Sequence, residues 1–392
     1  FKKLIWKNLQ IIVQLYLSTS TLNYLSRSPM HKIHRFFLAA FVATFFLFGS
    51  QASMASKPSI GFVLVGPQND GGWSMRHYQG FKSLEKHGYK SEFAEMVPEA
   101  DSERVFRKLA RKHDVVFGTS FGYMDPMVAA ASKDKSNTIF MHGTGYKVID
   151  GKLDNYNCRL YQARYLTGVA AGMLTKTNKI GFVGSHPIPE IVSNINAATL
   201  GAQSVNPNIE VNVIWINSWF DPPKDMDAAK TVKEWGADVL FTTTDSPNVV
   251  TLAQKESTPA KPLWSMGNDA PMNSFGPDRY ATGAMFNWNL FYKSVMDSVA
   301  AGTWKVNRSF WGLKENCVGL SPWGPNVPGE VVNKVETIKM NWINDEMDDD
   351  FPFSAGFTKQ DGTVVKAGEV GRKGIETMQY WVKGVISDFP VK

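Results

Sequence analysis

Two glycines and a tryptophan follow the first apolar run of the chain. After Ile60 to Val65 comes GPQNDGGWSM, in which Asp70 and Trp73 flank Gly71 and Gly72. A glycine-bearing turn between a buried strand and a helix is typical of a ligand site in α/β proteins. The glycine spacing does not fit G-x-G-x-x-G. Gly66 and Gly71 have the spacing of G-x-x-x-x-G-K-[ST], but no lysine follows them, which argues against phosphate. We expect the glycines to let the backbone turn tightly, so that Asp70 and Trp73 face a cleft together.

Rings and acids also follow the other predicted strands, without any lysine or arginine. Ligands bind at the carboxyl ends of parallel strands, so these loops should form one site. We expect Trp73 and Trp219 to stack on a flat ligand, and Asp70, Asp245 and Asp269 to accept its hydrogen bonds. The expected remaining wall residues are His142, Tyr123, Phe220 and Trp288. The alternatives are that Asp70 and Asp245 cap helices, and that Trp73 and His142 are core residues.

Metal-dependent chemistry lacks its motif. The sequence contains no H-E-x-x-H, and its histidines are scattered. We therefore expect no metal, no cofactor and no catalysis, but a site suited to a flat, neutral, nitrogen-rich ligand.

The elements that position these loops alternate along the chain. Short β-branched apolar runs, from Ile60–Val65 to Tyr280–Phe286, alternate with amphipathic segments such as Ser74–Lys86 and Glu190–Val205. This pattern predicts an α/β fold with parallel sheets covered on both faces. About 336 residues after the leader favour two domains. Because no Pro-rich or Ser-rich linker separates them, we expect the chain to cross between two lobes through strand ends.

The first 56 residues are treated separately. Residues 30–55 combine the basic start MHKIHR, the apolar FFLAAFVATFFLFG and small residues, as in a secretory signal peptide cleaved after Ala52 or Ala55. The alternative, a membrane anchor, would need about 20 apolar residues. Residues 1–29 show no evident role. We expect an exported, periplasmic protein with no cysteine for an acyl anchor.

Removing the leader changes the charge. Residues 1–56 contain six basic residues and no acidic ones, so 36 basic and 36 acidic residues remain. A body without net charge offers no basic patch for nucleic acid. Cys158 and Cys317 are the two cysteines of the chain. An oxidising compartment would permit them to pair, but the sequence leaves the pairing open.

The chain resembles the basic membrane protein (Bmp) family of ABC-transporter substrate-binding proteins. The resemblance is carried by GFVLVGPQNDGGWSMRHYQGF, RYLTGVAAGMLTKTNKIGFVG, GADVLFTTTDS and GND, and it covers residues 57–392. It implies a type I periplasmic-binding-protein fold with two parallel-sheet α/β lobes that close on a ligand. Residues 57–161 and about 288–317 would form lobe I and residues 162–287 lobe II, with the lobe of residues 318–392 left open. A membrane permease and an ATPase would be the partners of a monomer.

The family resemblance also implies a purine-nucleoside ligand, with departures. Asp70, Trp73 and Asp269 match the family's ligand positions, but the lysine expected to meet the ribose is replaced by Asn287-Trp288-Asn289. We therefore favour a free purine base such as adenine over a nucleoside. A secreted nucleoside hydrolase, using Asp70 and Asp269 as acid and base, is a second possibility. A sensor or adhesin is a third.

Overall fold

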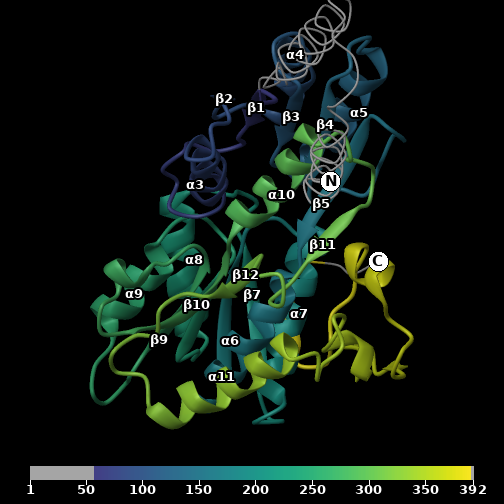
Figure 1. Ribbon diagram of the computed structural model, residues 1–392. Coiled ribbons are helices and arrows are strands. Elements are labelled where there is room, and N and C mark those ends of the chain that lie inside the picture. Colours follow the sequence, from purple (N-terminus) through teal and green to yellow (C-terminus); the bar gives the residue numbers. More distant parts are fainter. Residues whose placement is uncertain (1–56, 390–392) are drawn as a thin grey trace, which may run out of the picture. The chain divides into compact units, whose positions relative to one another are not determined.

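The computed structural model describes residues 57–389, which contain two parallel β-sheets with helices on both faces (Figure 1). The predicted signal peptide and residues 1–29 lie outside the described residues. The first sheet, with its helices, is called lobe I here. Its strand order is β11-β5-β4-β3-β1-β2, and all neighbours run parallel. The strands are β1 (Ile60–Val63), β2 (Ser91–Ala94), β3 (Val115–Gly118), β4 (Ile139–Gly143), β5 (Leu153–Cys158) and β11 (Ser309–Trp311).

The second sheet, with its helices, is called lobe II. Its order is β12-β10-β9-β8-β6-β7-β15, parallel except for β12, which runs antiparallel to β10. The strands are β6 (Lys179–Gly184), β7 (Glu210–Trp215), β8 (Val239–Thr242), β9 (Trp264–Asp269), β10 (Tyr280–Phe286), β12 (Val318–Leu320) and β15 (Val385–Ser387). The predicted α/β fold with parallel sheets is confirmed.

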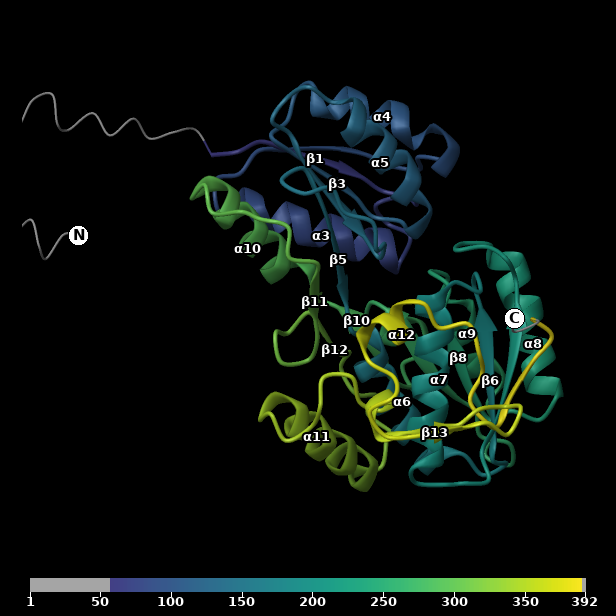
Figure 2. The ribbon, with the colours of Figure 1, turned by 90° about the vertical axis from the view of Figure 1, so that its right-hand side faces the viewer.

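Alternating side chains give each sheet two buried faces. In lobe I, Phe62 packs with α3 (Trp73–Glu85) and α10 (Trp288–Ala300), whereas Val63 packs with α4 (Ser102–Ala110) and α5 (Met124–Lys133). Helices α3 and α10 lie side by side, although more than 200 residues separate them (Figure 2). The period-2 alternation of the apolar runs thus directs one helix pair to each face.

Lobe II repeats this arrangement. Phe182 and Phe241 stack beneath α6 (Leu160–Leu174) and α7 (Pro189–Gln203). Val183 packs with α8 (Pro222–Glu234) and α9 (Asn248–Glu256) on the other face. The close pairing of α6 with α7 depends on glycine, because a Cβ at Gly168 would lie 2.0 Å from the Ala198 carbonyl oxygen. This contact helps to set where α7 begins relative to the cleft.

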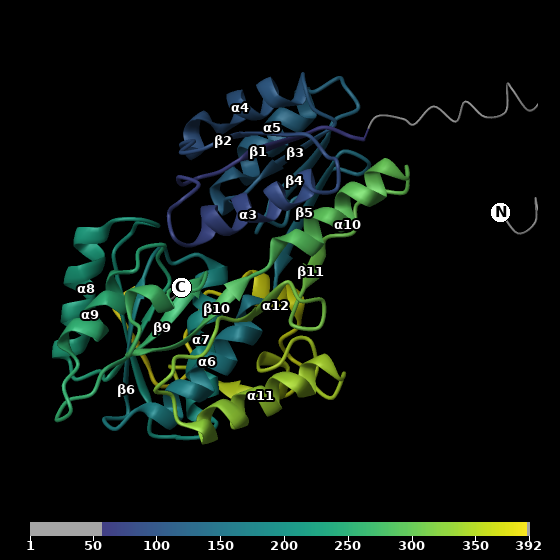
Figure 3. The same cartoon turned by 60° about the vertical axis from the view of Figure 1, so that its left-hand side comes forward.

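The chain crosses between the lobes three times, from β5 to α6, from β10 to α10 and from β11 to β12 (Figure 3). The crossings are fastened together. Cys158 and Cys317 form a disulfide that joins the first crossing to the third, with their Cα atoms 5.9 Å apart. The Asn287 amide donates to the Cys317 carbonyl at 2.8 Å, which links the second crossing to the third. The question that the sequence leaves open about the cysteines is thereby answered.

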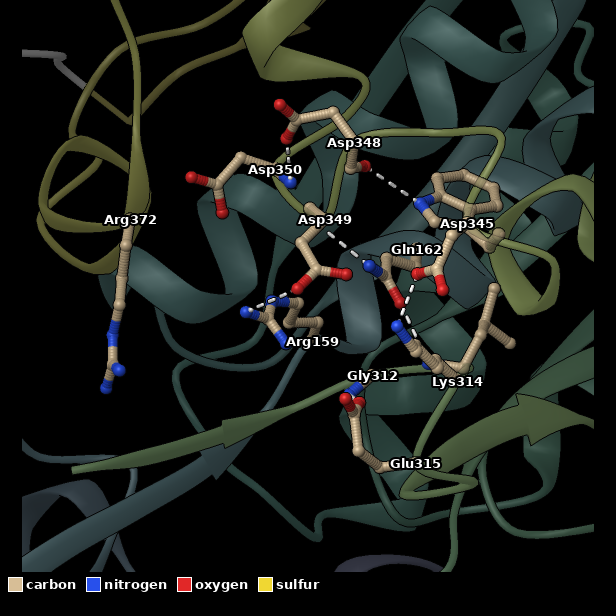
Figure 4. Close-up of polar contacts among 12 residues, drawn as sticks. Arg159, Gln162, Gly312, Lys314, Glu315, Asp345, Asp348, Asp349, Asp350 and Arg372 are labelled. Carbon is tan, nitrogen blue, oxygen red and sulfur yellow. Dashed lines mark hydrogen bonds and ion pairs between the residues drawn. The ribbon is translucent and has the colours of Figure 1, made fainter. Parts of the chain in front are cut away.

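The C-terminal segment packs on lobe II. It contains α11 (Gly329–Ile343), the antiparallel pair β13 (Phe357–Thr358) and β14 (Val364–Val365), α12 (Arg372–Glu376) and finally β15. Because β15 pairs with β7, this segment extends the second sheet. An acidic stretch of this segment also contacts the first crossing. The Asp349 carboxylate forms an ion pair with Arg159 (3.2 Å), and the Asp349 backbone carbonyl accepts a hydrogen bond from Gln162 (2.8 Å) (Figure 4).

Strands β1 to β4 and β6 to β10 each lie within three residues of an apolar run that the sequence predicts as a strand. Strands β5, β11 and β12, at the first and third crossings, are not predicted. Strand β5 has the sequence LDNYNC, and its buried Asp154 accepts hydrogen bonds from the Asn307 and Arg308 amides. A buried strand whose polar side chains are satisfied by a distant loop carries no apolar pattern, so sequence periodicity does not detect it.

Candidate functional site

A cavity lies between the carboxyl ends of the two sheets. About 480 Å³ of space there is free of protein atoms, including the open mouth of the cavity. Lobe I contributes Val65, Trp73, Ser120, Phe121 and Thr144 to its wall. Lobe II and the crossings contribute Leu160, Ile188, Glu190, Ile191, Asn194, Trp219, Thr243, Asp245, Asp269 and Phe286. The wall is therefore mostly aromatic and aliphatic, with three carboxyl groups.

Trp73 is held in the cavity wall by its own hydrogen bond and by other rings. Its indole N–H donates to the Thr119 carbonyl, and the rings of Phe286 and Trp288 lie nearly perpendicular to it, with centroids 5.1 and 5.7 Å away. These contacts fix the indole in the cavity wall, where it can stack on a flat ligand.

Asp70, directly before the two glycines, serves the helix that Trp73 begins. Its carboxylate accepts from the backbone amides of Gly72 (2.9 Å), Ser74 (2.8 Å) and Met75 (3.0 Å). These are N–H groups that the first turn of a helix leaves without partners. Burial raises the pKa of Asp70, and these amides act in the opposite direction. Asp70 does not line the cavity. It occupies the position of a helix cap, which is the alternative that the sequence leaves open for it.

Asp245 reaches the same helix from the opposite lobe. Its Oδ1 accepts a hydrogen bond from the backbone N–H of Trp73 at 2.6 Å, across the cleft. A Cβ at Gly72 would lie 2.2 Å from that oxygen, which explains the need for glycine there. Burial, together with the nearby carboxylates of Asp70 and Asp269, raises the pKa of Asp245 well above its ordinary value. Asp245 both lines the cavity and joins the two lobes.

Trp219 forms the lobe II counterpart of Trp73. It follows β7, packs against the His186 ring with centroids 4.7 Å apart, and accepts the Asp245 amide on its carbonyl at 2.9 Å. Its neighbour Phe220 is 45 % exposed and is not in the cavity wall. Of these two adjacent rings, the structure therefore brings only Trp219 to the site.

Asp269 and Thr144 approach the cavity with left-handed backbone, at φ 59° and 66°. This conformation is unusual for Thr144, which is β-branched, and such backbone strain is often found at ligand sites. Asp269 lies near the fully buried Arg164, which donates to the carbonyls of Gly267 (3.3 Å) and Thr242 (3.1 Å). Burial raises the pKa of Asp269 to about 7, against the opposing effect of Arg164. The buried Thr144 hydroxyl has no partner among the described residues.

Glu190 is a third acid in the cavity wall, in the first turn of α7. Burial, and then the charge of Asp269, raise its pKa to about 8, while Asn157 acts to lower it. Glu190 also lines a second cavity of about 470 Å³, which shares Phe121, Thr144, Leu160 and Asn194 with the first. The far wall of this second cavity includes Ile375 and Glu376 of the C-terminal segment.

Three further predicted residues lie behind the wall. Tyr123 is in the lobe I core, where its hydroxyl donates to the Val97 carbonyl at 2.6 Å. His142 is buried, and its Nε2 pairs with the carbonyl of Ser120, so it supports a wall residue. Trp288 is only 2 % exposed and stacks between His77 and Phe286, with centroids 4.4 and 4.8 Å away. Its ring braces Trp73 from behind.

Among the predicted residues, the structure thus brings Trp73, Trp219, Asp245 and Asp269 together. It places Asp70, His142, Tyr123, Phe220 and Trp288 outside the cavity wall. Glu190, Asn194, Phe121, Thr144 and Phe286 are wall residues that the prediction omits. Phe121 and Thr144 do follow predicted strands, so loop position alone would include them. Glu190 is hidden because an acid in the first turn of a helix resembles ordinary dipole pairing.

The wall contains no lysine or arginine, so it is not suited to a phosphate. In residues 57–389, no group of three His, Cys, Asp or Glu side chains is arranged to hold a metal. None of the helices within this range is long and apolar enough to cross a bilayer.

Comparisons with known proteins agree on the class of protein. The family model described as ABC transporter substrate-binding protein PnrA-like (Bmp) matches residues 57–348. A purine-binding protein of Brucella abortus is 39 % identical over 352 residues, which is 88 % of this chain and 97 % of the relative. A putative ABC transporter glucose-binding protein of Haloferax volcanii is also 39 % identical, over 76 % of each chain.

Solved structures share the fold. A solute-binding protein of an ABC transporter system from Aeropyrum pernix superposes with a TM-score of 0.63 at 17 % identity, over 74 % of this chain and 92 % of that one. A corresponding protein from Conexibacter woesei gives a TM-score of 0.59 at 21 % identity, covering 74 % and 97 %. These likenesses confirm the two-lobed fold expected from the sequence.

Proposed function

The chain belongs to the Bmp family of ABC transporter substrate-binding proteins, and we propose that its ligand is a purine, with a free base such as adenine favoured. Members of this class deliver a solute to a membrane permease with its ATPase, and they are binding proteins rather than enzymes. The hydrolase alternative therefore has no support. Capture in the periplasm by a monomer completes the proposal.

The observation that carries the proposal is the composition of the cavity wall. Trp73 from lobe I and Trp219 from lobe II face the same space, so a flat ring could stack on both when the lobes are closed. Asp245 and Asp269 lie in the same wall and can accept hydrogen bonds from ring N–H or amino groups. A purine presents apolar faces and a polar edge, which fits this separation of rings from acids.

A hexose fits the wall less well. Each hydroxyl of glucose needs a hydrogen-bond partner when it is buried, and an unpaired one costs about 1–3 kcal/mol. Eight of the fifteen wall residues are aromatic or aliphatic: Val65, Trp73, Phe121, Leu160, Ile188, Ile191, Trp219 and Phe286. If a ligand with polar groups around its whole rim were bound here, several of those polar groups would face carbon atoms of the wall.

A free base is favoured over a nucleoside because of the ring at Trp288. Trp288, two residues after β10, packs in the core behind Trp73, is not in the cavity wall and offers the cavity no polar group for a sugar. One feature favours the alternative of a nucleoside, namely the second cavity beyond Glu190, which could receive a ribose.

Ligand binding is expected to shift the lobes toward the closed state through contacts made in both lobes. Isothermal titration calorimetry with adenine, guanine, adenosine, guanosine and glucose tests the proposal. We expect adenine to bind most tightly. Binding of nucleosides alone would reject the free base, and binding of glucose alone would reject the purine class.

A further inference from the structure

We propose that Glu190 determines which purine binds, by pairing as a neutral carboxylic acid with an acceptor nitrogen and an adjacent amino group on one edge of the base. The inference rests on the proposed function, because it concerns the same cavity. It adds a specificity-determining residue and a chemical requirement on the ligand.

The position of Glu190 makes such a contact possible. The side chain lines the cavity that contains Trp73 and Trp219, and it also lines the second cavity, so it stands at the boundary between them. Its helix is held in place by the close α6–α7 packing at Gly168. An acid on a packed helix keeps its geometry better than one on a loop, which suits a residue that discriminates between ligands.

The surroundings of Glu190 favour its neutral form. Neither cavity wall contains a lysine or arginine. By contrast with Glu190, Glu376 across the second cavity pairs with two cations, Arg308 at 3.0 Å and Arg372 at 2.8 Å. The dipole at the start of α7 favours a negative charge. Burial and the charge of Asp269 outweigh this effect, since together they raise the pKa of Glu190 to about 8.

Other titratable or charged groups occur on every element around Glu190. Asp269 ends β9 and disfavours a further negative charge at Glu190, and Asp245 follows β8. Elsewhere the groups are His186 before α7, Tyr161 and Arg164 on α6, and Arg372, Lys373 and Glu376 on α12. Arg164 is committed to backbone carbonyls and to Asn268, and Arg372 to Glu376. Lys373 is exposed to solvent, and neither it nor any other lysine or arginine lines the two cavities beside Glu190.

A neutral carboxyl group has one O–H donor beside one carbonyl acceptor. Adenine presents the complementary pair, a ring nitrogen that accepts and an amino group that donates. The side-chain amide of glutamine has the same donor and acceptor arrangement and pairs with adenine through two hydrogen bonds. An ionised carboxylate has only acceptors, so it would oppose the ring nitrogen. The Glu190→Gln variant should therefore have the donor and acceptor arrangement of neutral Glu190 at every pH.

The test is calorimetric titration of adenine into the wild-type protein and E190Q at about pH 6 and about pH 9, in buffers of different ionisation enthalpy. The wild-type protein should lose about tenfold in affinity at the higher pH and take up close to one proton on binding. E190Q should bind adenine at both pH values without that proton. Glu190→Met, which cannot pair, should bind at least about tenfold more weakly at both.

Glu256→Gln provides the control, because this acid lies on α9 and pairs with Lys233. It should keep the wild-type pH dependence and proton uptake. Proton uptake by E190Q equal to that of the wild-type protein would overturn the inference, as would full affinity of Glu190→Met. Failure of the proposed function has a different signature, because no purine would then bind to the wild-type protein at either pH.

Discussion

The Asp245 side chain of lobe II caps a helix of lobe I, since its Oδ1 accepts a 2.6 Å hydrogen bond from the backbone N–H of Trp73. Asp70 satisfies three other amides at the same helix end. The start of α3 therefore binds one carboxylate from its own lobe and one from the other. The second contact can exist only when the lobes are closed, so it stabilises the form that holds ligand.

Replacing Asp245 with alanine should weaken adenine binding about fivefold to thirtyfold. The variant loses a cross-lobe hydrogen bond to a charged or polar acceptor, which contributes about 1–2 kcal/mol to closure. Asp245→Asn keeps the oxygen acceptor and should stay within about threefold of wild type. Calorimetry measures both affinities. Equal binding by wild type and D245A would show that the contact does not contribute to closure.

Gly72→Ala should weaken binding at least tenfold and also lower the free energy of unfolding. The added methyl group would lie 2.2 Å from Asp245 Oδ1, so it obstructs closure, and the backbone at φ −139° and ψ −115° is outside the regions that alanine favours. Gly329→Ala is the matched control because nothing lies within 4 Å of its Cβ position. Calorimetry and urea denaturation check the two quantities. If Gly72→Ala bound ligand normally, the Gly72 loop would have to lie farther from Asp245 in the closed state than it does in this structure.

Trp73→Ala and Trp219→Ala should each reduce purine affinity at least tenfold, because each removes a stacking face together with its buried area. Trp235→Ala, at the end of α8 on the far side of lobe II, should bind normally. Titration calorimetry on the three variants makes the comparison. If only one of the two cavity tryptophans mattered, stacking from both lobes would be excluded.

The stability of the ligand-free protein should decline between about pH 4 and pH 8 through Glu190. Its pKa is raised to about 8 in the folded state, so the folded protein retains a proton that the unfolded chain releases above about pH 4. The free energy of unfolding then falls as pH rises through this window, by at most about 1.4 kcal/mol per pH unit for one group. E190Q should lack this part of the decline. Urea denaturation of both proteins across the window measures the difference, and parallel curves would contradict it.

Removing the disulfide with Cys158→Ala and Cys317→Ala should cost about 2–5 kcal/mol of stability, because the bond closes a loop of 159 residues between two crossings. Chemical denaturation with and without a thiol reductant measures this loss. Reductant should lower the stability of the wild-type protein and leave that of the double variant unchanged. A double variant as stable as wild type would show that sheet pairing and the contacts of Asp349 suffice to hold the crossings.

Pattern along the chain is enough to predict most of the framework. Strands such as Ile60–Val63 and Val239–Thr242 are buried on both faces, and a parallel strand in this position is typically a nearly continuous apolar run, so their position is evident. The glycine pair before Trp73 likewise indicates a close approach. Strands β5 and β11 are not detectable in this way, because one carries polar residues satisfied from afar and the other has three residues.

The choice of wall residues depends on packing that no local pattern encodes. Trp73 and Trp288 both follow strands, yet one faces the cavity and the other braces it, because α3 and α10 pack together and only the outer ring can reach the cleft. Glu190 becomes a wall residue through the approach of α7 to α6, and Asp245 meets the Trp73 amide only when the second lobe is present. The positions of the apolar strands follow from the local pattern, whereas the side chains that reach the cavity are selected by contacts between separate elements, such as α3 with α10 and Asp245 with Trp73.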